Sequence, residues 1–83
     1  METQESYDQA ICRLVALALQ VPEEQVSAQL AFGEIPQWTS LGHMEIMFQL
    51  ESELGVEISE ETITQLISIP AMVAYLQENG VQH

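Results

Sequence analysis

Basic residues are almost absent from this chain of 83 residues. It contains no Lys, and Arg13 is its single Arg against 13 Asp and Glu, so the formal net charge is −12. Phosphate recognition by proteins depends on Lys and Arg, so the composition argues against nucleic acid and against an anionic membrane surface as partners. Partner proteins with basic patches suit a surface of this charge.

Cysteine and long apolar runs are also scarce. Cys12 is the only cysteine, so no disulfide can form within the chain, which suits a reducing compartment. The longest apolar stretch, residues 10–19, contains Arg13 and is too short to span a bilayer. The N-terminus lacks the cationic segment of a secretory signal. We therefore expect a cytoplasmic protein, a monomer with one domain over residues 1–83.

Apolar residues make up 47% of the chain, more than a disordered acidic tail contains. Their spacing predicts helices over residues 3–20, 40–54, 60–66 and 69–79. The predicted fold is all-α, a small bundle of three main helices plus one short helix. Residues 23–39 form a long connection with one helical turn, held to the core by the apolar side chains of Val26, Leu30, Phe32, Ile35 and Trp38.

The predicted helix ends have the residue types that start and stop helices. Thr39 or Ser40 can cap the helix that begins near residue 40, and Gly55 follows its last apolar residue. For the other helices the expected signals are Ser6 or Thr3 as the first cap, Ser59 and Ser68 as later caps, and Gly80 as the final stop.

The helix over residues 40–54 has two apolar faces. At 100° per residue, Ile46, Leu50, Leu54 and Met47 cluster on one side, which we assign to the core. The opposite side has the apolar residues Leu41, Met44 and Phe48, flanked by Glu45 and Glu51. An exposed apolar stripe with acidic neighbours predicts a protein docking surface. The alternative is that both sides of this helix are buried.

The sequence offers little for catalysis or metal binding. Ser40 and His43 are neighbours on a helix, but no acid is placed to orient the imidazole, and His43 falls on the inward side. No pair of His or Cys ligands and no Asp-rich calcium loop is present. We expect neither a catalytic residue nor a metal site.

Ser40 is the residue with the most chemical interest. It lies at the start of a helix, after a long loop and beside the apolar stripe. Helix N-termini favour anions, so a phosphate group esterified to this hydroxyl would be stabilised. The segment Trp38-Thr39-Ser40-Leu41-Gly42 and the helix after it resemble the attachment motif of acyl carrier proteins, whose usual core is Asp-Ser-Leu. The resemblance extends over residues 6–79 and includes the Gly55 turn and the short acidic helix after it.

The resemblance implies a non-catalytic carrier. Ser40 would bear 4′-phosphopantetheine, added from coenzyme A by a phosphopantetheinyl transferase, and the thiol of that arm would hold acyl or aminoacyl groups as thioesters. The helix that follows would meet partner enzymes that load, transfer or condense acyl groups, through its outward residues Leu41, Met44, Glu45, Phe48 and Glu51.

The chain differs from the usual motif at two positions, since Thr39 replaces Asp and Gly42 stands where fatty acid carriers often have another acid. Trp38 and the run from Leu41 to Met44 look more like discrete carriers of polyketide, peptide or other specialised pathways. Two alternatives stay open. One is an unmodified acidic helical module that binds a basic partner, and the other is a small hydrolase built on Ser40 and His43.

Overall fold

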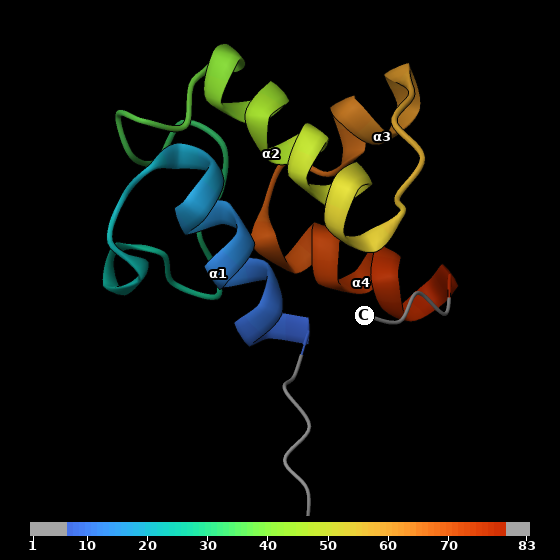
Figure 1. Ribbon diagram of the computed structural model, residues 1–83, viewed down its shortest axis with the longest axis horizontal. Helices are drawn as coiled ribbons and strands as arrows, with labels where there is room; N and C mark the ends of the chain where they lie inside the picture. The colour runs from blue at the N-terminus through green and yellow to red at the C-terminus, as the bar shows by residue number, and fades with distance from the viewer. Residues whose placement is uncertain (1–6, 80–83) are drawn as a thin grey trace, which may run out of the picture.

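The structure, a computed structural model, describes residues 7–79 of the chain (Figure 1). The helices are α1 (Tyr7–Leu19), α2 (Ser40–Leu54), α3 (Glu60–Gln65) and α4 (Ile69–Asn79), and a 3₁₀ turn covers Glu23–Gln25. The all-α bundle of three main helices and one short helix is therefore confirmed. The short helix ends at Gln65, one residue earlier than predicted. The expected caps Thr3 and Ser6 and the stop at Gly80 lie outside the described residues.

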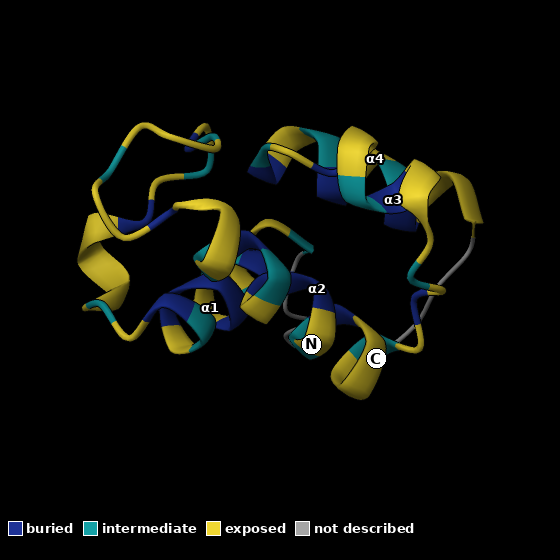
Figure 2. Ribbon diagram, turned by 90° about the horizontal axis from the view of Figure 1, so that it is seen from above, coloured by how far each residue is buried: buried dark blue, intermediate teal, exposed yellow. Residues whose placement is uncertain are grey.

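In the view of Figure 1, helices α1 and α2 run in opposite directions, and α4 lies below α2 and beside the lower half of α1. Helix α1 contacts both α2 and α4. In Figure 2, the buried residues of α4 lie on the side turned toward α1, and its exposed residues lie on the opposite side. The core contains Ile11 and Val15 of α1, Ile46, Met47 and Leu50 of α2, Ile69, Met72 and Leu76 of α4, and Trp38.

Local capping explains where three of the helices begin. The Thr39 hydroxyl accepts the Gly42 N–H at 3.2 Å at the start of α2, and Ser59 forms a capping box with Thr62 at the start of α3. The Ser68 hydroxyl accepts the Ala71 N–H at 3.1 Å at the start of α4. Gly55 ends α2 in the left-handed conformation, with φ 72°, as its position predicts.

The long connection between α1 and α2 is ordered, and the predicted helical turn is present. Val26, Leu30 and Trp38 anchor it in the core, whereas Phe32, which was expected to be an anchor, is 42% exposed. Its backbone is tied to the segment before α4, because the Phe32 N–H donates to the Ile67 carbonyl and the Ile69 N–H donates to the Leu30 carbonyl, both at 2.9 Å. These bonds fix the route by which the chain reaches the start of α2.

Candidate functional site

Ser40 is exposed at the first position of α2. The N-cap is Thr39 and not Ser40, since the Thr39 hydroxyl accepts the Gly42 N–H and the Thr39 carbonyl accepts the His43 N–H at 2.7 Å. Within residues 7–79, no hydrogen bond uses the Ser40 hydroxyl. The sequence left open whether Thr39 or Ser40 caps α2. In the structure Thr39 is the cap, and the Ser40 side chain is left exposed to solvent.

Other serines are used differently. The hydroxyls of Ser59 and Ser68 accept capping N–H groups, and the Ser27 hydroxyl accepts the Gln29 N–H at 3.4 Å. Ser52 is exposed but lies in the last turn of α2, at the C-terminal end of the helix. Ser40 combines an exposed hydroxyl with the N-terminus of a helix, where the helix dipole favours negative charge.

His43 is 5% exposed and uses both ring nitrogens in hydrogen bonds. Its Nδ1 accepts the Trp38 Nε1–H at 3.0 Å, so its Nε2 carries the proton that goes to the Ile63 carbonyl at 2.9 Å. Trp38 also stacks on the imidazole with ring centroids 6.1 Å apart. The histidine therefore joins the connection, α2 and α3, and it fixes the segment immediately before Ser40.

This arrangement rules out the hydrolase built on Ser40 and His43. A general base needs a free nitrogen within reach of the serine oxygen. Here Nδ1 is taken by Trp38 and Nε2 by a backbone carbonyl of α3. His43 is a structural residue, buried on the inward side as the helical pattern predicted.

The outward face of α2 is exposed, as the sequence predicted, with one exception. Leu41 is 74% exposed and Phe48 is 53% exposed, and the flanking residues Glu45 and Glu51 are exposed too. Met44 is instead half-buried and packs against the core. We refer to the four exposed residues as the outward face. The alternative that both sides of α2 are buried is wrong.

In the described part of the chain, grooves lie along α1 and α2. The first, which we call the serine groove, has a volume of about 370 Å³ beside the start of α2. Its walls are the end of α1, the last part of the connection and the first turns of α2, and its lining residues are Ala18, Leu19, Gln20, Pro36, Gln37, Thr39, Leu41, Gly42 and Glu45.

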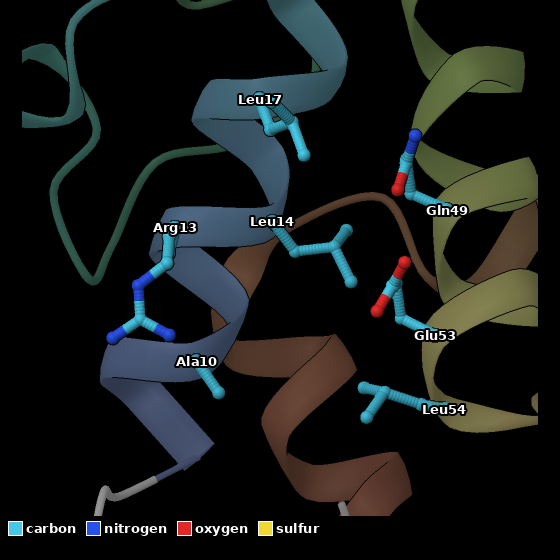
Figure 3. A pocket seen from close by; sticks show the side chains of 7 residues that line it. All are labelled: Ala10, Arg13, Leu14, Leu17, Gln49, Glu53 and Leu54. Carbon is cyan, nitrogen blue, oxygen red and sulfur yellow. The ribbon is translucent and has the colours of Figure 1, made fainter.

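The second groove, of about 410 Å³, lies between α1 and the C-terminal half of α2. Figure 3 shows Leu14 of α1 and Glu53 of α2 pointing toward one another across it. Leu17, which is 65% exposed, forms part of the α1 wall. This groove lies beside residues 49–54, so the serine groove is the one next to Ser40.

The serine groove depends on a close approach at Gly42. A Cβ at this position would collide with the Gln37 carbonyl oxygen and would lie 2.8 Å from Leu19 Cδ2. Glycine therefore lets the connection and the end of α1 lie directly against the first turn of α2. The sequence carries this signal, since a glycine inside a helix often indicates close packing.

Gln20 has a conformation that glutamine rarely adopts. Its φ is 60°, in the left-handed region, at the end of α1, where the Val21 N–H donates to the Ala16 carbonyl at 3.0 Å. Glycine is the usual residue at such a position, and another residue costs about 1–2 kcal/mol there. Gln20 and Gln37 were not predicted to line a groove, because nothing in the local pattern marks either of them.

Other chemical groups are few. Partial burial, with Asp8 and Glu23 nearby, raises the pKa of the Cys12 thiol above its ordinary value, so it reacts slowly as a nucleophile. In the described part of the chain, no three His, Cys, Asp or Glu side chains come together to hold a metal ion. Over the same 73-residue range, 7–79, none of the helices is long and apolar enough to cross a membrane.

A small helical bundle with an exposed serine at a helix start has the features of a carrier to which a group is attached. A family model described as a phosphopantetheine attachment site matches residues 9–76, which include this serine. The chain belongs to the phosphopantetheine attachment family. The predicted membership of the acyl carrier protein group is thereby confirmed.

Two curated relatives agree with this assignment, and both are named acyl carrier protein. The one from Rickettsia bellii strain OSU 85-389 is 28% identical over 79 residues, which cover 95% of this chain and 98% of the relative. The one from Rickettsia bellii strain RML369-C is 27% identical over 79 residues, with 95% and 92% covered. Proteins of this type are carriers and not enzymes, and their cofactor is covalently bound 4′-phosphopantetheine.

The start of α2 fits a phosphate ester. The Ser40 hydroxyl is exposed and unused within the described residues, and the positive end of the helix dipole lies at its position. Thr39 provides the cap without adding negative charge, so nothing at the N-cap repels a phosphate. The phosphate would attach the arm, and the arm would supply the thiol that forms thioesters.

Proposed function

We propose that Ser40 carries 4′-phosphopantetheine and that the chain presents acyl or aminoacyl thioesters to biosynthetic enzymes. The observation that supports this most is the division of roles at the start of α2, where Thr39 caps the helix and leaves the Ser40 hydroxyl exposed. Transfer from coenzyme A would join the Ser40 oxygen to phosphorus, release adenosine 3′,5′-bisphosphate, and pass the hydroxyl proton to a base of the transferase.

The outward face of α2 is the surface that partner enzymes would meet. Its exposed leucine and phenylalanine supply apolar contact, and Glu45 and Glu51 attract basic patches. With a net charge of −12, the chain favours fast, electrostatically guided association. A carrier needs such encounters, because each enzyme must release it again. The expected partners are the phosphopantetheinyl transferase and enzymes that load, transfer or condense acyl groups.

The decisive experiment is intact-protein mass spectrometry after incubation with coenzyme A, Mg²⁺ and a broad-specificity phosphopantetheinyl transferase. We expect the mass to increase by one phosphopantetheinyl group, and fragment spectra to assign it to Ser40. Ser40→Ala should abolish the gain. Ser52→Ala, which removes an exposed serine of the same helix, should leave the gain unchanged and serves as the matched control.

If the chain gains no mass while a known carrier is modified alongside, it is an unmodified interaction module. In that case Thr39→Asp, which keeps the cap and restores the usual acid of the motif, tests whether the N-cap residue is what prevents loading. If Ser40→Ala still gains the group, the chain is a carrier and the attachment residue is another one.

A further inference from the structure

The hydrogen bond between the Trp38 and His43 side chains spans Ser40, because the serine lies between the two residues in sequence. We propose that His43 is a positioning residue for the loading of Ser40, and that it acts only while its Nδ1 atom carries no proton. This role rests on the proposed function, since loading is the reaction concerned. Acid is then expected to slow loading by loosening the segment that precedes α2.

Backbone hydrogen bonds hold both ends of this side-chain bond in place. On the connection, the Trp38 N–H donates to the Ile35 carbonyl and the Gly33 N–H donates to the Trp38 carbonyl, both at 3.1 Å. On α2, the His43 N–H donates to the Thr39 carbonyl at 2.7 Å. The bond from indole to imidazole, at 3.0 Å, joins these two sets. The backbone on either side of the serine is therefore fixed through one histidine ring.

Ser40 and His43 lie on the same side of α2. At 100° per residue, positions 40 and 43 are about 60° apart around the helix axis. The His43 ring also meets the Phe32 ring edge-on, with centroids 5.5 Å apart, and its Nε2 donates to the Ile63 carbonyl at 2.9 Å. The connection and α3 therefore reach the serine's side of α2 through the imidazole.

The arrangement fits one protonation state of the imidazole only. The indole N–H can donate but cannot accept, so Nδ1 of His43 must offer a lone pair, while the Nε2 proton goes to the Ile63 carbonyl. A second proton, taken up from water at Nδ1, would place two N–H groups face to face. Trp38 is 1% exposed, so its N–H has no water as a substitute, and a buried donor without an acceptor is costly. The indole then has to move away, and its segment moves with it.

The groups around the ring offer no replacement for the lost bond. The residues that contact the imidazole are Trp38, Phe32 and Ile63, and none of them is charged. Within the described residues, no carboxylate bonds to the ring. Histidine is the side chain whose ordinary titration falls between pH 5 and 8, so a mild change of pH tests the bond. The charged residues closest in sequence to the ring and its contacts are the exposed glutamates Glu34, Glu45, Glu60 and Glu61.

The first test examines the bond by NMR on the ¹⁵N-labelled apo form of the full chain. At pH 8 we expect the His43 ring to be the Nε2–H tautomer, with Nδ1 unprotonated. Between pH 8 and pH 5 the indole N–H resonance of Trp38, the only tryptophan, should shift in step with the ring. An Nδ1–H tautomer, a ring that stays neutral down to pH 5, or an indole resonance that does not follow the ring would each overturn the proposal.

The second test compares the loading of the wild type and of His43→Asn at pH 8 and pH 5.5. The ratio of the two cancels the pH dependence of the transferase itself. The asparagine oxygen lies near the place of Nδ1 and accepts the indole N–H, but it takes up no proton in this range. We expect the kcat of the wild type to fall about fivefold relative to His43→Asn on going to pH 5.5, as for one lost hydrogen bond. KM should change little, because the outward face is untouched.

Two further variants complete the set. His83→Asn removes the other histidine of the chain, so its pH profile should match that of the wild type. Trp38→Phe removes the indole donor but keeps an aromatic ring, so its kcat should be about fivefold lower at pH 8 and should fall no further with acid than that of His43→Asn. If His43→Asn does not fold, Trp38→Phe takes its place as the reference.

The outcomes separate the two proposals. If neither the wild type nor any variant accepts the arm, the proposed function fails, and the role of His43 in loading falls with it. If holo protein forms and the ratio of the wild type to His43→Asn is the same at both pH values, the proposed function stands and the positioning role is wrong. The positioning role is also wrong if acid raises KM and leaves kcat unchanged, since the histidine then affects docking.

Discussion

Leu50 on one face of α2 is 1% exposed, whereas Leu41 on the opposite face is 74% exposed, although both are leucines of the same helix. The inner face packs against α1 and the rest of the core, whereas the side chains of the outward face are exposed. Residue type therefore does not decide burial here. The neighbouring elements decide it, since among the described residues they bury Leu50 and leave Leu41 largely exposed.

The difference in exposure between the two faces of α2 separates residues that stabilise the fold from residues that contribute little to its stability. Apolar side chains on the inner face stabilise the bundle through burial, at about 25 cal/mol per Å² of apolar area. Leu41 and Phe48 leave most of that area in water, so they contribute little to stability. Their presence in the outward face is consistent with a role in docking, where the same area would be buried by a partner.

The largest expected effect comes from truncating the same residue type on each face. Leu50→Ala should lower the free energy of unfolding by about 2–5 kcal/mol, because it leaves a cavity in the core. Leu41→Ala should change it by less than about 0.5 kcal/mol. Urea unfolding followed by circular dichroism measures both. Equal losses would mean that the outward face is also packed. Should Leu50→Ala fail to fold, Ile46→Val, with a cost of about 0.5–1.5 kcal/mol, replaces it.

The next effect concerns the contact at Gly42. Alanine is about 1 kcal/mol better than glycine inside a helix, but overpacking costs about 1–3 kcal/mol. The obstacle is a backbone carbonyl, which moves only with the connection, so we expect Gly42→Ala to destabilise by about 1–2 kcal/mol net. Trp38 fluorescence follows the displacement, since Trp38 belongs to the same segment. Ser52→Ala on exposed α2 surface should instead stabilise slightly. A more stable Gly42→Ala would show that the connection yields easily.

The bounds of α2 and the starts of α3 and α4 could be predicted from the sequence because their signals are local. Ser59 and Ser68 cap helix starts and Gly55 ends a helix, each through contacts within a few residues of its own position. Such signals can be recognised in the local sequence. The inner face of α2 was also predictable, since its apolar residues repeat with the helical period.

The rest depends on contacts between distant parts of the chain. The bonds from His43 to Trp38 and to the Ile63 carbonyl span 5 and 20 residues, and no local pattern encodes them. Met44 is half-buried because it packs against the core. The helical period predicts which side of a helix a residue lies on, but not how far its neighbours bury it. The serine groove was missed for the same reason, since three separate segments form it.

The charge on the outward face should affect loading more than folding. We expect Glu45→Lys to lower the kcat/KM of loading by a basic phosphopantetheinyl transferase about tenfold at low salt, with the effect shrinking as salt is added. Glu78→Lys makes the same change of charge on exposed α4 and is the matched control. If both variants slow loading equally, overall charge guides the encounter, and the outward face has no special part in it.

The smallest expected difference in the free energy of unfolding is that between variants of two adjacent residues at the start of α2. Thr39→Ala removes the side-chain oxygen that accepts the Gly42 N–H, so the free energy of unfolding should fall by about 0.5–2 kcal/mol. Ser40→Ala removes a hydroxyl that no described residue uses, so stability should change by less than about 0.5 kcal/mol, in a helix position where alanine is well tolerated. Thermal unfolding of the apo forms checks both. The division of roles predicts that stability depends on Thr39 and loading on Ser40, and a Ser40→Ala loss as large as that of Thr39→Ala would contradict it.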